Sequence, residues 1–542
     1  PSDPPGYFLL MLAPGLQKDT LPFPKDLILV LDRSGSMDGE KFRQAQQALD
    51  YILSHLNPGD RFNIITFSTG TERYANRLRP ADYAGNARTW VNGLRAEGST
   101  DINRALLEAA DMVDDDRPTY LIFLTDGLPT EGVTDSERIL SNFAGAASPD
   151  LRLFVFGVGY DVDTYLLDSL AQGHHGSSSY VLPEDRLDEL LSTFYARIST
   201  PVLTGLALDF DGLVTYDLYP SPLPDLFAGS QVLVVGRYRE GERVDVTLSG
   251  LVNSQPRQFT YENQYFSEES PDDNVLKAIP RLWATRKIGY LLNEIRLSGA
   301  NQELIDQVVR LSIRFGIVTP YTSYLVTETA PLGVAEQDRI VQEQLNLMAT
   351  GTPAPSFGQA AVEKASAEGE LADAGSASAI TGEAAETVRI VGARTFVLSE
   401  GIWIDTAFDP QAMQTVPVSF LSEDYFTLVA SQPELADAFA LGDRVIALSD
   451  GTAYEVVAAD AVVQPLDLPP TPPPDESTDL LTNSTPVTET GGNTPASPLP
   501  SVTPVASQPE PTEPSSGPCA SGLIPLLLLP LLAVLLKKRD RG

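Results

Sequence analysis

Oxygen-bearing side chains at five positions along the chain could together hold a divalent cation. Asp32, Ser34 and Ser36 stand on alternating residues of one short segment, and Thr100 and Asp126 lie in two later segments. A hard cation such as Mg²⁺ prefers carboxylate and other oxygen ligands in near-octahedral geometry. These five residues are therefore the candidate metal site, and the same oxygens would also accept Mn²⁺ or Ca²⁺.

The charge of this ligand set indicates what such a metal would do. Two carboxylates only just neutralise a divalent ion, and the hydroxyl groups add oxygen atoms without adding charge. If one carboxylate acts through water, the metal stays electrophilic, and an exchangeable position can accept an acidic group from outside. We therefore predict recognition of an exposed carboxylate on a partner, since a site with four carboxylates would be saturated.

The elements around these residues predict where they lie. Asp26–Leu31, Tyr120–Thr125 and Leu151–Val158 are apolar runs typical of strands that are buried on both faces. Amphipathic helices, such as Gly39–Leu56, separate them, which predicts an α/β fold with a doubly wound parallel sheet over residues 26–200. Ligands bind at the carboxyl ends of such strands, and the segment at Asp32 begins there.

Three motifs in this region resemble the metal-ion-dependent adhesion site of von Willebrand factor A domains. Asp-x-Ser-x-Ser follows a buried strand, Gly-Ser-Thr-Asp stands downstream, and Leu-Thr-Asp-Gly ends another strand. The resemblance implies a Rossmann-like A domain that mediates adhesion or protein–protein interaction through a metal ion. Residue by residue, it assigns the metal to Asp32, Ser34, Ser36, Thr100 and Asp126.

Further segments resemble the bacterial relatives of the inter-alpha-trypsin inhibitor heavy chains. They are Pro5–Leu12, Leu282–Ile288 and Ser312–Val326. In that family the A domain follows a β-rich domain called VIT. The resemblance implies that residues 1–25 are the remnant after a missing VIT-like domain, and that residues 201–330 are the family's β-rich and helical region.

The composition of the remaining chain changes several times. We expect an Ala/Gly/Ser/Glu linker at 331–389, a small β-rich domain at 390–462, a disordered Pro/Ser/Thr-rich stalk at 463–518, and a membrane anchor or sorting segment at 519–542. Ala520–Leu536 is almost wholly apolar and precedes a basic cluster, which predicts a membrane helix with the cluster in the cytoplasm. Cys519 beside it is either lipidated or an unmodified small residue. We therefore predict a cell-surface protein with its domains outside.

The charge balance excludes one class of partner. The chain of 542 residues has 37 basic and 73 acidic residues, for a net charge of −36. Such a field repels phosphates, so no nucleic acid is expected as a partner. The chain begins with Pro rather than Met and opens without a signal peptide, so we expect an export signal upstream.

Two other functions are consistent with a metal at this place. A Mg²⁺-dependent hydrolase would also place Asp32 at a strand end. However, position 34 is Ser where phosphatases of the Asp-x-Asp class need Asp, and the chain has no G-x-S-x-G motif and only three His residues. The other alternative is an architectural envelope protein whose metal only rigidifies the fold. We predict that the protein is not an enzyme.

Overall fold

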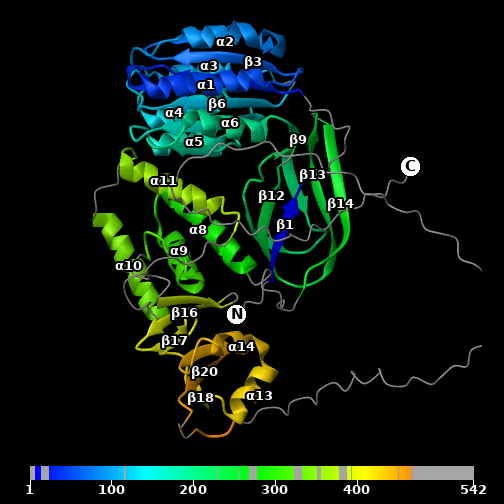
Figure 1. The fold of residues 1–542 in the computed structure, drawn as a ribbon, viewed down its shortest axis with the longest axis vertical. Coiled ribbons are helices and arrows are strands. Elements are labelled where there is room, and N and C mark those ends of the chain that lie inside the picture. The colour runs from blue at the N-terminus through cyan, green and yellow to red at the C-terminus, as the bar shows by residue number, and fades with distance from the viewer. Residues whose placement is uncertain are drawn as a thin grey trace, which may run out of the picture. The chain divides into compact units, whose positions relative to one another are not determined.

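The computed structural model describes most of the chain as far as residue 466 (Figure 1). The described residues are 6–13, 24–114, 117–228, 230–253, 255–267, 278–322, 333–350, 356–376, 387–391, 394–449, 451–459, 461 and 463–466. All of them belong to the compact unit Pro1–Pro472. None of the helices in these ranges is both long and apolar enough to cross a membrane. The predicted membrane helix and nearly all of the predicted stalk lie outside them.

A seven-stranded sheet forms the centre of the A-type region and confirms the predicted parallel α/β fold. Its strands are β2 (Asp26–Asp32), β3 (Arg61–Phe67), β4 (Thr71–Arg73), β5 (Arg79–Pro80), β6 (Thr119–Thr125), β7 (Leu151–Val158) and β8 (Ser178–Val181). The order is β4-β3-β2-β6-β7-β8, with β5 on β3, and only β4 and β5 are antiparallel to their neighbours. All residues of β2, β6 and β7 are buried, as their apolar runs predict.

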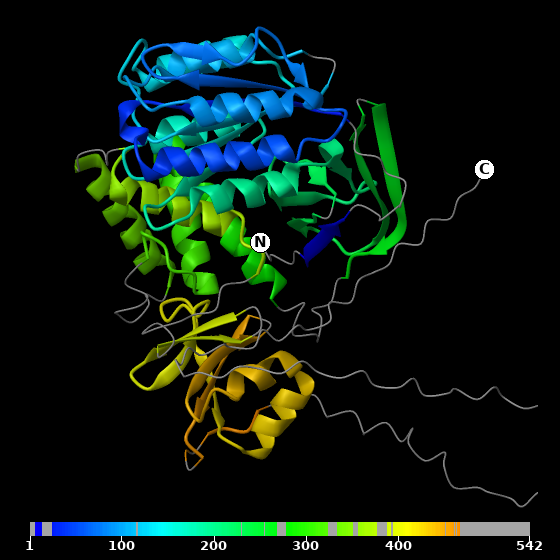
Figure 2. The same ribbon diagram turned by 45° about the horizontal axis from the view of Figure 1, so that its top comes forward.

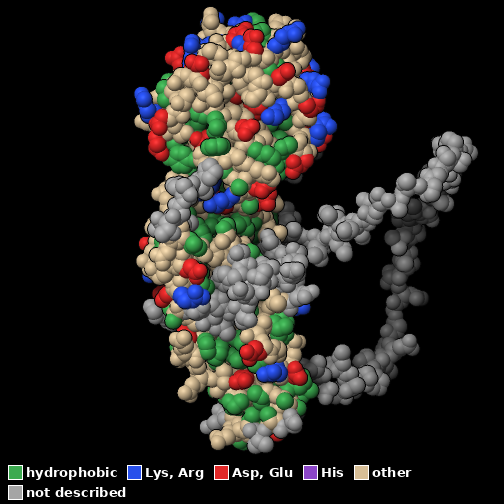
Figure 3. All heavy atoms as spheres, turned by 90° about the vertical axis from the view of Figure 1, so that its left-hand side faces the viewer, with side chains coloured by type: hydrophobic (Ala, Val, Ile, Leu, Met, Phe, Trp, Pro, Cys, Tyr) green, Lys and Arg blue, Asp and Glu red, His purple; other side chains and the backbone are tan. Residues whose placement is uncertain are grey.

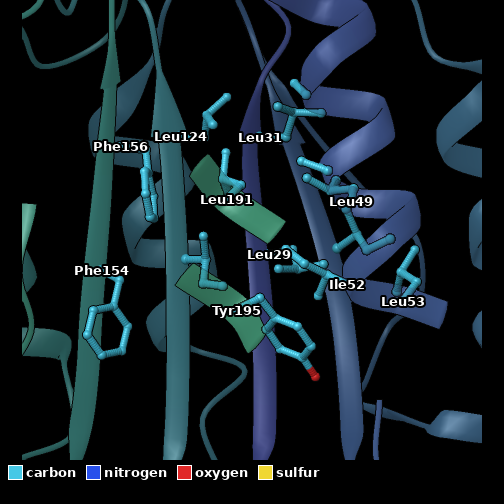
Figure 4. Close-up of a cluster of buried hydrophobic side chains, with 14 of the residues drawn as sticks. Leu29, Leu31, Leu49, Ile52, Leu53, Leu124, Phe154, Phe156, Leu191 and Tyr195 are labelled. Carbon is cyan, nitrogen blue, oxygen red and sulfur yellow. The ribbon is translucent and has the colours of Figure 1, made fainter. Parts of the chain in front are cut away.

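Helices cover both faces of this sheet. One face carries α1 (Glu40–Ser54), α2 (Ala84–Gly93) and α6 (Leu187–Ile198), with the short 3₁₀ turns η1 (Gly35–Met37) and η2 (Ala81–Tyr83) nearby; the other carries α3 (Ile102–Ala110), α4 (Ser136–Ala146) and α5 (Thr164–Gly173). Side chains alternate along β2, so Leu29 and Leu31 pack against α1 and α6, while Ile28 and Val30 face the opposite core (Figure 4). Burial on both faces fixes the strand ends that carry the candidate site.

A β-sandwich is built from segments on both sides of the A-type region in the sequence. Its strands are β1 (Gly6–Leu12), β9 (Pro201–Asp209), β10 (Thr215–Tyr219), β11 (Leu226–Phe227), β12 (Val232–Tyr238), β13 (Arg243–Val252) and β14 (Gln255–Tyr265). The sheets have the orders β1-β12-β10 and β11-β9-β13-β14. β1 runs antiparallel to β12, from Gly6 opposite Tyr238 to Leu12 opposite Val232. Residues 6–12, within the segment predicted as a remnant, therefore complete a sheet of the region after the A-type fold.

Helices also occupy a region where the sequence predicts a linker. α8 (Ile279–Ser298) and α9 (Gln302–Phe315) are followed by α10 (Val334–Thr350) and α11 (Gln359–Ala372). The segment 331–389, predicted as a linker, thus contains the two helices α10 and α11. Ala and Glu are strong helix formers, and α11 buries Val362 and Ala365, the former in the core beside α5. Tertiary packing thus decides a segment whose composition is typical of a linker.

The region predicted as a small β-rich domain contains a six-stranded sheet (Figure 2). Its elements are β15 (Val388–Val391), β16 (Arg394–Ser399), β17 (Ile402–Asp405), β18 (Thr415–Ser419), α13 (Glu423–Ser431), α14 (Pro433–Phe439), β19 (Val445–Ser449) and β20 (Thr452–Val457). The strand order is β15-β16-β17-β19-β20-β18. Leu428 and Phe439 from the two helices pack on Val445 of the sheet.

A glycine in α8 allows α11 to approach closely, which gives a first prediction. A Cβ at Gly289 would lie 2.3 Å from the backbone nitrogen of Ala372. We expect Gly289→Ala to lower the free energy of unfolding by about 1–3 kcal/mol, because overpacking must push α11 away from α8. Urea denaturation and amide hydrogen exchange in α11 measure this effect.

The matched control is Gly145→Ala in α4, where no atom lies within 4 Å of the added Cβ. That substitution should be neutral or stabilise by about 0.5–1 kcal/mol, since Ala is the better helix former. Equal effects of the two substitutions would contradict the close packing of α8 and α11.

Candidate metal centre

The carboxylate of Asp32 lies at the end of β2 and is held by two different segments. Its Oδ1 accepts a hydrogen bond from the backbone nitrogen of Ser34 at 2.7 Å, and its Oδ2 accepts one from Oγ1 of Thr125 at 2.6 Å. Thr125 is the last residue of β6, the strand beside β2. The Asp32 side chain is fully buried. The parallel pairing of the two strands therefore fixes the orientation of this carboxylate.

A chain of side-chain hydrogen bonds connects the Asp32 turn with Asp126. The hydroxyl oxygens of Ser34 and Ser36 are 3.0 Å apart, and the Ser36 hydroxyl donates to Oδ1 of Asp126 at 2.7 Å. Asp126 directly follows β6 and is buried, whereas Ser36 on η1 is exposed. The two strand ends thus form one polar cluster that opens to the surface at Ser36.

Thr100 reaches the same cluster from the segment before α3. The backbone nitrogen of Gly35 donates to the carbonyl of Gly98 at 3.0 Å, which brings that segment against the Asp32 turn. A Cβ at Gly127 would lie 3.6 Å from Oγ1 of Thr100 and 3.8 Å from Oγ of Ser36. Both hydroxyl oxygens therefore border one small space that Gly127 leaves open.

The structure brings together all five residues of the sequence-predicted site at the carboxyl edge of the parallel sheet. They come from three segments that are separated by between 26 and 94 positions in the chain: Asp32, Ser34, Ser36, Thr100 and Asp126. That they bind a metal ion stays a prediction.

Electrostatics at this cluster favour a cation. Burial raises the pKa of Asp32 to about 6, and the negative charge of Asp126 adds to that rise, while hydrogen bonds from Thr125 and Ser34 act against it. Desolvation disfavours a charged carboxylate because water no longer stabilises it. Two buried carboxylates in one cluster are therefore stabilised by a positive charge placed between them.

Two contacts at the cluster were not found from the sequence. Thr125 donates to Asp32, and Lys41 on the first turn of α1 lies with its Nζ 2.8 Å from Oδ2 of Asp126. The position of Thr125 next to Asp126 was the available signal for the first. Lys41 has no sequence feature that distinguishes it from an ordinary surface lysine, so only the folded chain reveals its contact with Asp126.

The residues present fit a hard divalent cation. All donors are oxygen atoms, both carboxylates are buried, and an ammonium group already lies on one of them. Mg²⁺ suits such a set because it prefers oxygen ligands and retains exchangeable water. Asp32, Ser34, Ser36, Thr100 and Asp126 would hold the ion, which when bound would supply an electrophilic centre for an acidic ligand.

Comparison with known proteins agrees with the fold and places it in a class. Residues 26–194 match the family described as von Willebrand factor type A domain. This range begins with β2 and ends within α6, so it covers the sheet and the helices on both its faces. Residues 26–194 are therefore a von Willebrand factor type A domain.

The similarity to particular proteins extends beyond this domain. The chain is 32% identical over 342 residues to inter-alpha-trypsin inhibitor heavy chain H4 of Homo sapiens, a match that covers 60% of this chain and 36% of the relative. Heavy chain H3 of Rattus norvegicus is 30% identical over 349 residues, covering 60% of this chain and 38% of that protein. The chain thus spans little more than a third of the length of these relatives.

Among solved structures, one match is a von Willebrand factor type A protein from Catenulispora acidiphila. It matches with a TM-score of 0.43 and 16% sequence identity, over 70% of this chain and 98% of that chain.

The raised pKa of Asp32 gives a second prediction. Its carboxyl binds a proton more tightly in the folded than in the unfolded state, so without metal its ionisation destabilises the fold as pH rises from about 4 to about 6. We expect Asp32→Asn to avoid this loss and, in EDTA at pH 7, to unfold with a free energy about 2–3 kcal/mol higher than the wild type. Urea denaturation between pH 4.5 and 7.5 measures the difference.

The same comparison in excess Mg²⁺ should reverse the order, since the ion would stabilise only the wild type. Asp38→Asn is the matched control because Asp38 is exposed on the same turn. A difference that stays the same across the pH range would contradict the raised pKa of Asp32.

Proposed function

We propose that the A domain binds an exposed carboxylate of a protein partner through a divalent cation, most suitably Mg²⁺. The observation that carries this proposal is the convergence of two buried carboxylates and three hydroxyl groups at the edge of the sheet. Mg²⁺ takes about six ligands, so five side chains leave at least one position for an outside group. An acidic group is the ligand that such a position would attract.

A protein partner follows from the class of domain and from the surface. Von Willebrand factor type A domains generally mediate protein–protein interaction or adhesion. Acidic and basic side chains are interspersed on the face shown in Figure 3, where the described residues form no continuous basic patch. This mixture and the net charge of −36 favour a protein over a nucleic acid as the partner.

A place at the cell surface is part of the proposal. Its support is the apolar C-terminal segment Ala520–Leu536 with the basic cluster after it. That segment would anchor the chain in the membrane and leave the A domain outside, where an adhesive role is useful.

Metal uptake gives the third prediction. We expect Asp126→Ala to weaken Mg²⁺ binding by more than roughly 100-fold, because loss of an outer-sphere group alone costs up to that factor. Isothermal titration calorimetry of the full chain with MgCl₂ measures it. Asp38→Asn is the control and should keep the affinity of the wild type; Mg²⁺ uptake that survives in Asp126→Ala would refute this centre.

Ligand binding gives the fourth prediction and separates the proposal from its alternatives. Peptides selected from a displayed library on the protein in Mg²⁺ should carry Asp or Glu. These peptides should no longer bind in EDTA, and they should not bind the Asp126→Ala variant. Peptides whose own Asp or Glu is replaced by Asn or Gln should not bind the wild type. Metal uptake without any acidic ligand would instead indicate an architectural metal, and Mg²⁺-dependent turnover of phosphate esters would indicate a hydrolase.

A further inference from the structure

The ammonium group of Lys41 lies on a buried carboxylate of the candidate metal centre. Its Nζ is 2.8 Å from Oδ2 of Asp126, whose side chain is fully buried, while 42% of the Lys41 side chain remains exposed. The other oxygen of Asp126 accepts the hydrogen bond from Ser36. Both oxygens of this carboxylate are thus engaged, one by a hydroxyl and one by a positive charge.

The position of Lys41 allows its charge to leave. Lysine carries a compact charge on a flexible four-carbon stem, and this stem is partly in solvent. Gly159 lies in the loop after β7. A Cβ placed on Gly159 would be 3.6 Å from Nζ of Lys41, which is its nearest neighbouring atom. A residue without a side chain therefore borders the ammonium group on that side.

A divalent cation and the ammonium group would occupy the same electrostatic position. Asp126 carries one negative charge, and Lys41 already compensates it. A metal ion bound between Asp32 and Asp126 would be repelled by an ammonium group so close to one of its ligands, since like charges about 4 Å apart repel even in water. Metal binding must therefore include the cost of displacing Lys41.

We propose that Lys41 is an internal cation that competes with the metal ion at Asp126 and thereby sets the metal affinity of the domain. The proposal rests on the proposed metal site and adds a residue that determines its affinity. In the absence of metal, Lys41 neutralises a buried carboxylate; in its presence, the ammonium group moves toward solvent on the same face.

The test compares two variants that each remove one positive charge from α1. Lys41→Met removes the ammonium group at Asp126. Arg43→Met removes an exposed guanidinium that pairs with Glu40, also on α1. Both substitutions change the net charge of α1 by the same amount. A difference in Mg²⁺ affinity between the two variants therefore reports the direct contact of Lys41 with Asp126. Lys41→Gln is a second variant in case Lys41→Met fails to fold.

Isothermal titration of the full chain with MgCl₂ gives the dissociation constant for each protein. We expect Lys41→Met and Lys41→Gln to bind Mg²⁺ about tenfold more tightly than the wild type, and Arg43→Met to change the constant less than about twofold. Urea denaturation supplies a second readout. Lys41→Met should be less stable than the wild type in EDTA, and saturating Mg²⁺ should stabilise it by more than it stabilises the wild type.

The outcomes separate this proposal from the proposed function. Equal constants for the wild type and the Lys41 variants, or weaker binding by those variants, would overturn the competition and leave the metal site in place. Weaker binding would show that Lys41 orients Asp126 for the metal. Failure of the wild type and of all variants to take up Mg²⁺ would overturn the metal site and the competition together.

Discussion

The hydrogen bond from Thr125 to Asp32 joins the ends of two neighbouring parallel strands, and the rest of the site depends on that junction. Strands β2 and β6 pair in register up to Leu31 opposite Leu124, so the polar residues that follow them emerge side by side. The buried strands hold this register, because a shift by one residue would move each side chain from one apolar core into the other, where the packing is different. A rigid apolar sheet thus positions a polar cluster that could not stabilise itself.

The charge of that cluster has a cost that the fold must offset. Asp32 and Asp126 are both buried, and buried carboxylates are stable only when hydrogen bonds or opposite charges compensate them. Here hydroxyl groups supply part of the compensation and Lys41 supplies a charge. A cluster arranged in this way is suited to reversible binding of a cation. Lys41 supplies the positive charge without the cation, and the cation would supply it when bound.

The domain with the candidate site is not packed as a free-standing unit. Arg296 of α8 forms two ion pairs: its Nη1 is 2.5 Å from Oδ2 of Asp168 on α5, and its Nε is 2.7 Å from Oε2 of Glu368 on α11. Both carboxylates are nearly inaccessible to solvent. Val362 of α11 also joins the core next to α5. Removing one member of such a network would leave a buried charge without compensation. The helices after the β-sandwich therefore contribute to the stability of the A domain.

Elements with local signals can be predicted from the sequence alone. Continuous apolar runs predicted β2, β6 and β7, because strands covered on both faces need apolar side chains at every position. The order of Asp-x-Ser-x-Ser, Thr100 and Asp126 predicted which side chains meet, because the carboxyl ends of parallel strands share one edge. The first inference depends only on neighbouring residues, and the second combines three short motifs with a known sheet geometry.

Features that depend on distant contacts become visible only in the folded chain. β1 pairs with β12 across more than two hundred residues, and nothing in its seven residues specifies that partner. α11 has the composition of a linker, and it is distinguished by the apolar surface it buries. Lys41 resembles any exposed lysine until α1 is packed beside Asp126. Pairing, docking and charge contacts of this kind arise from the packing of segments, which no short stretch of sequence encodes.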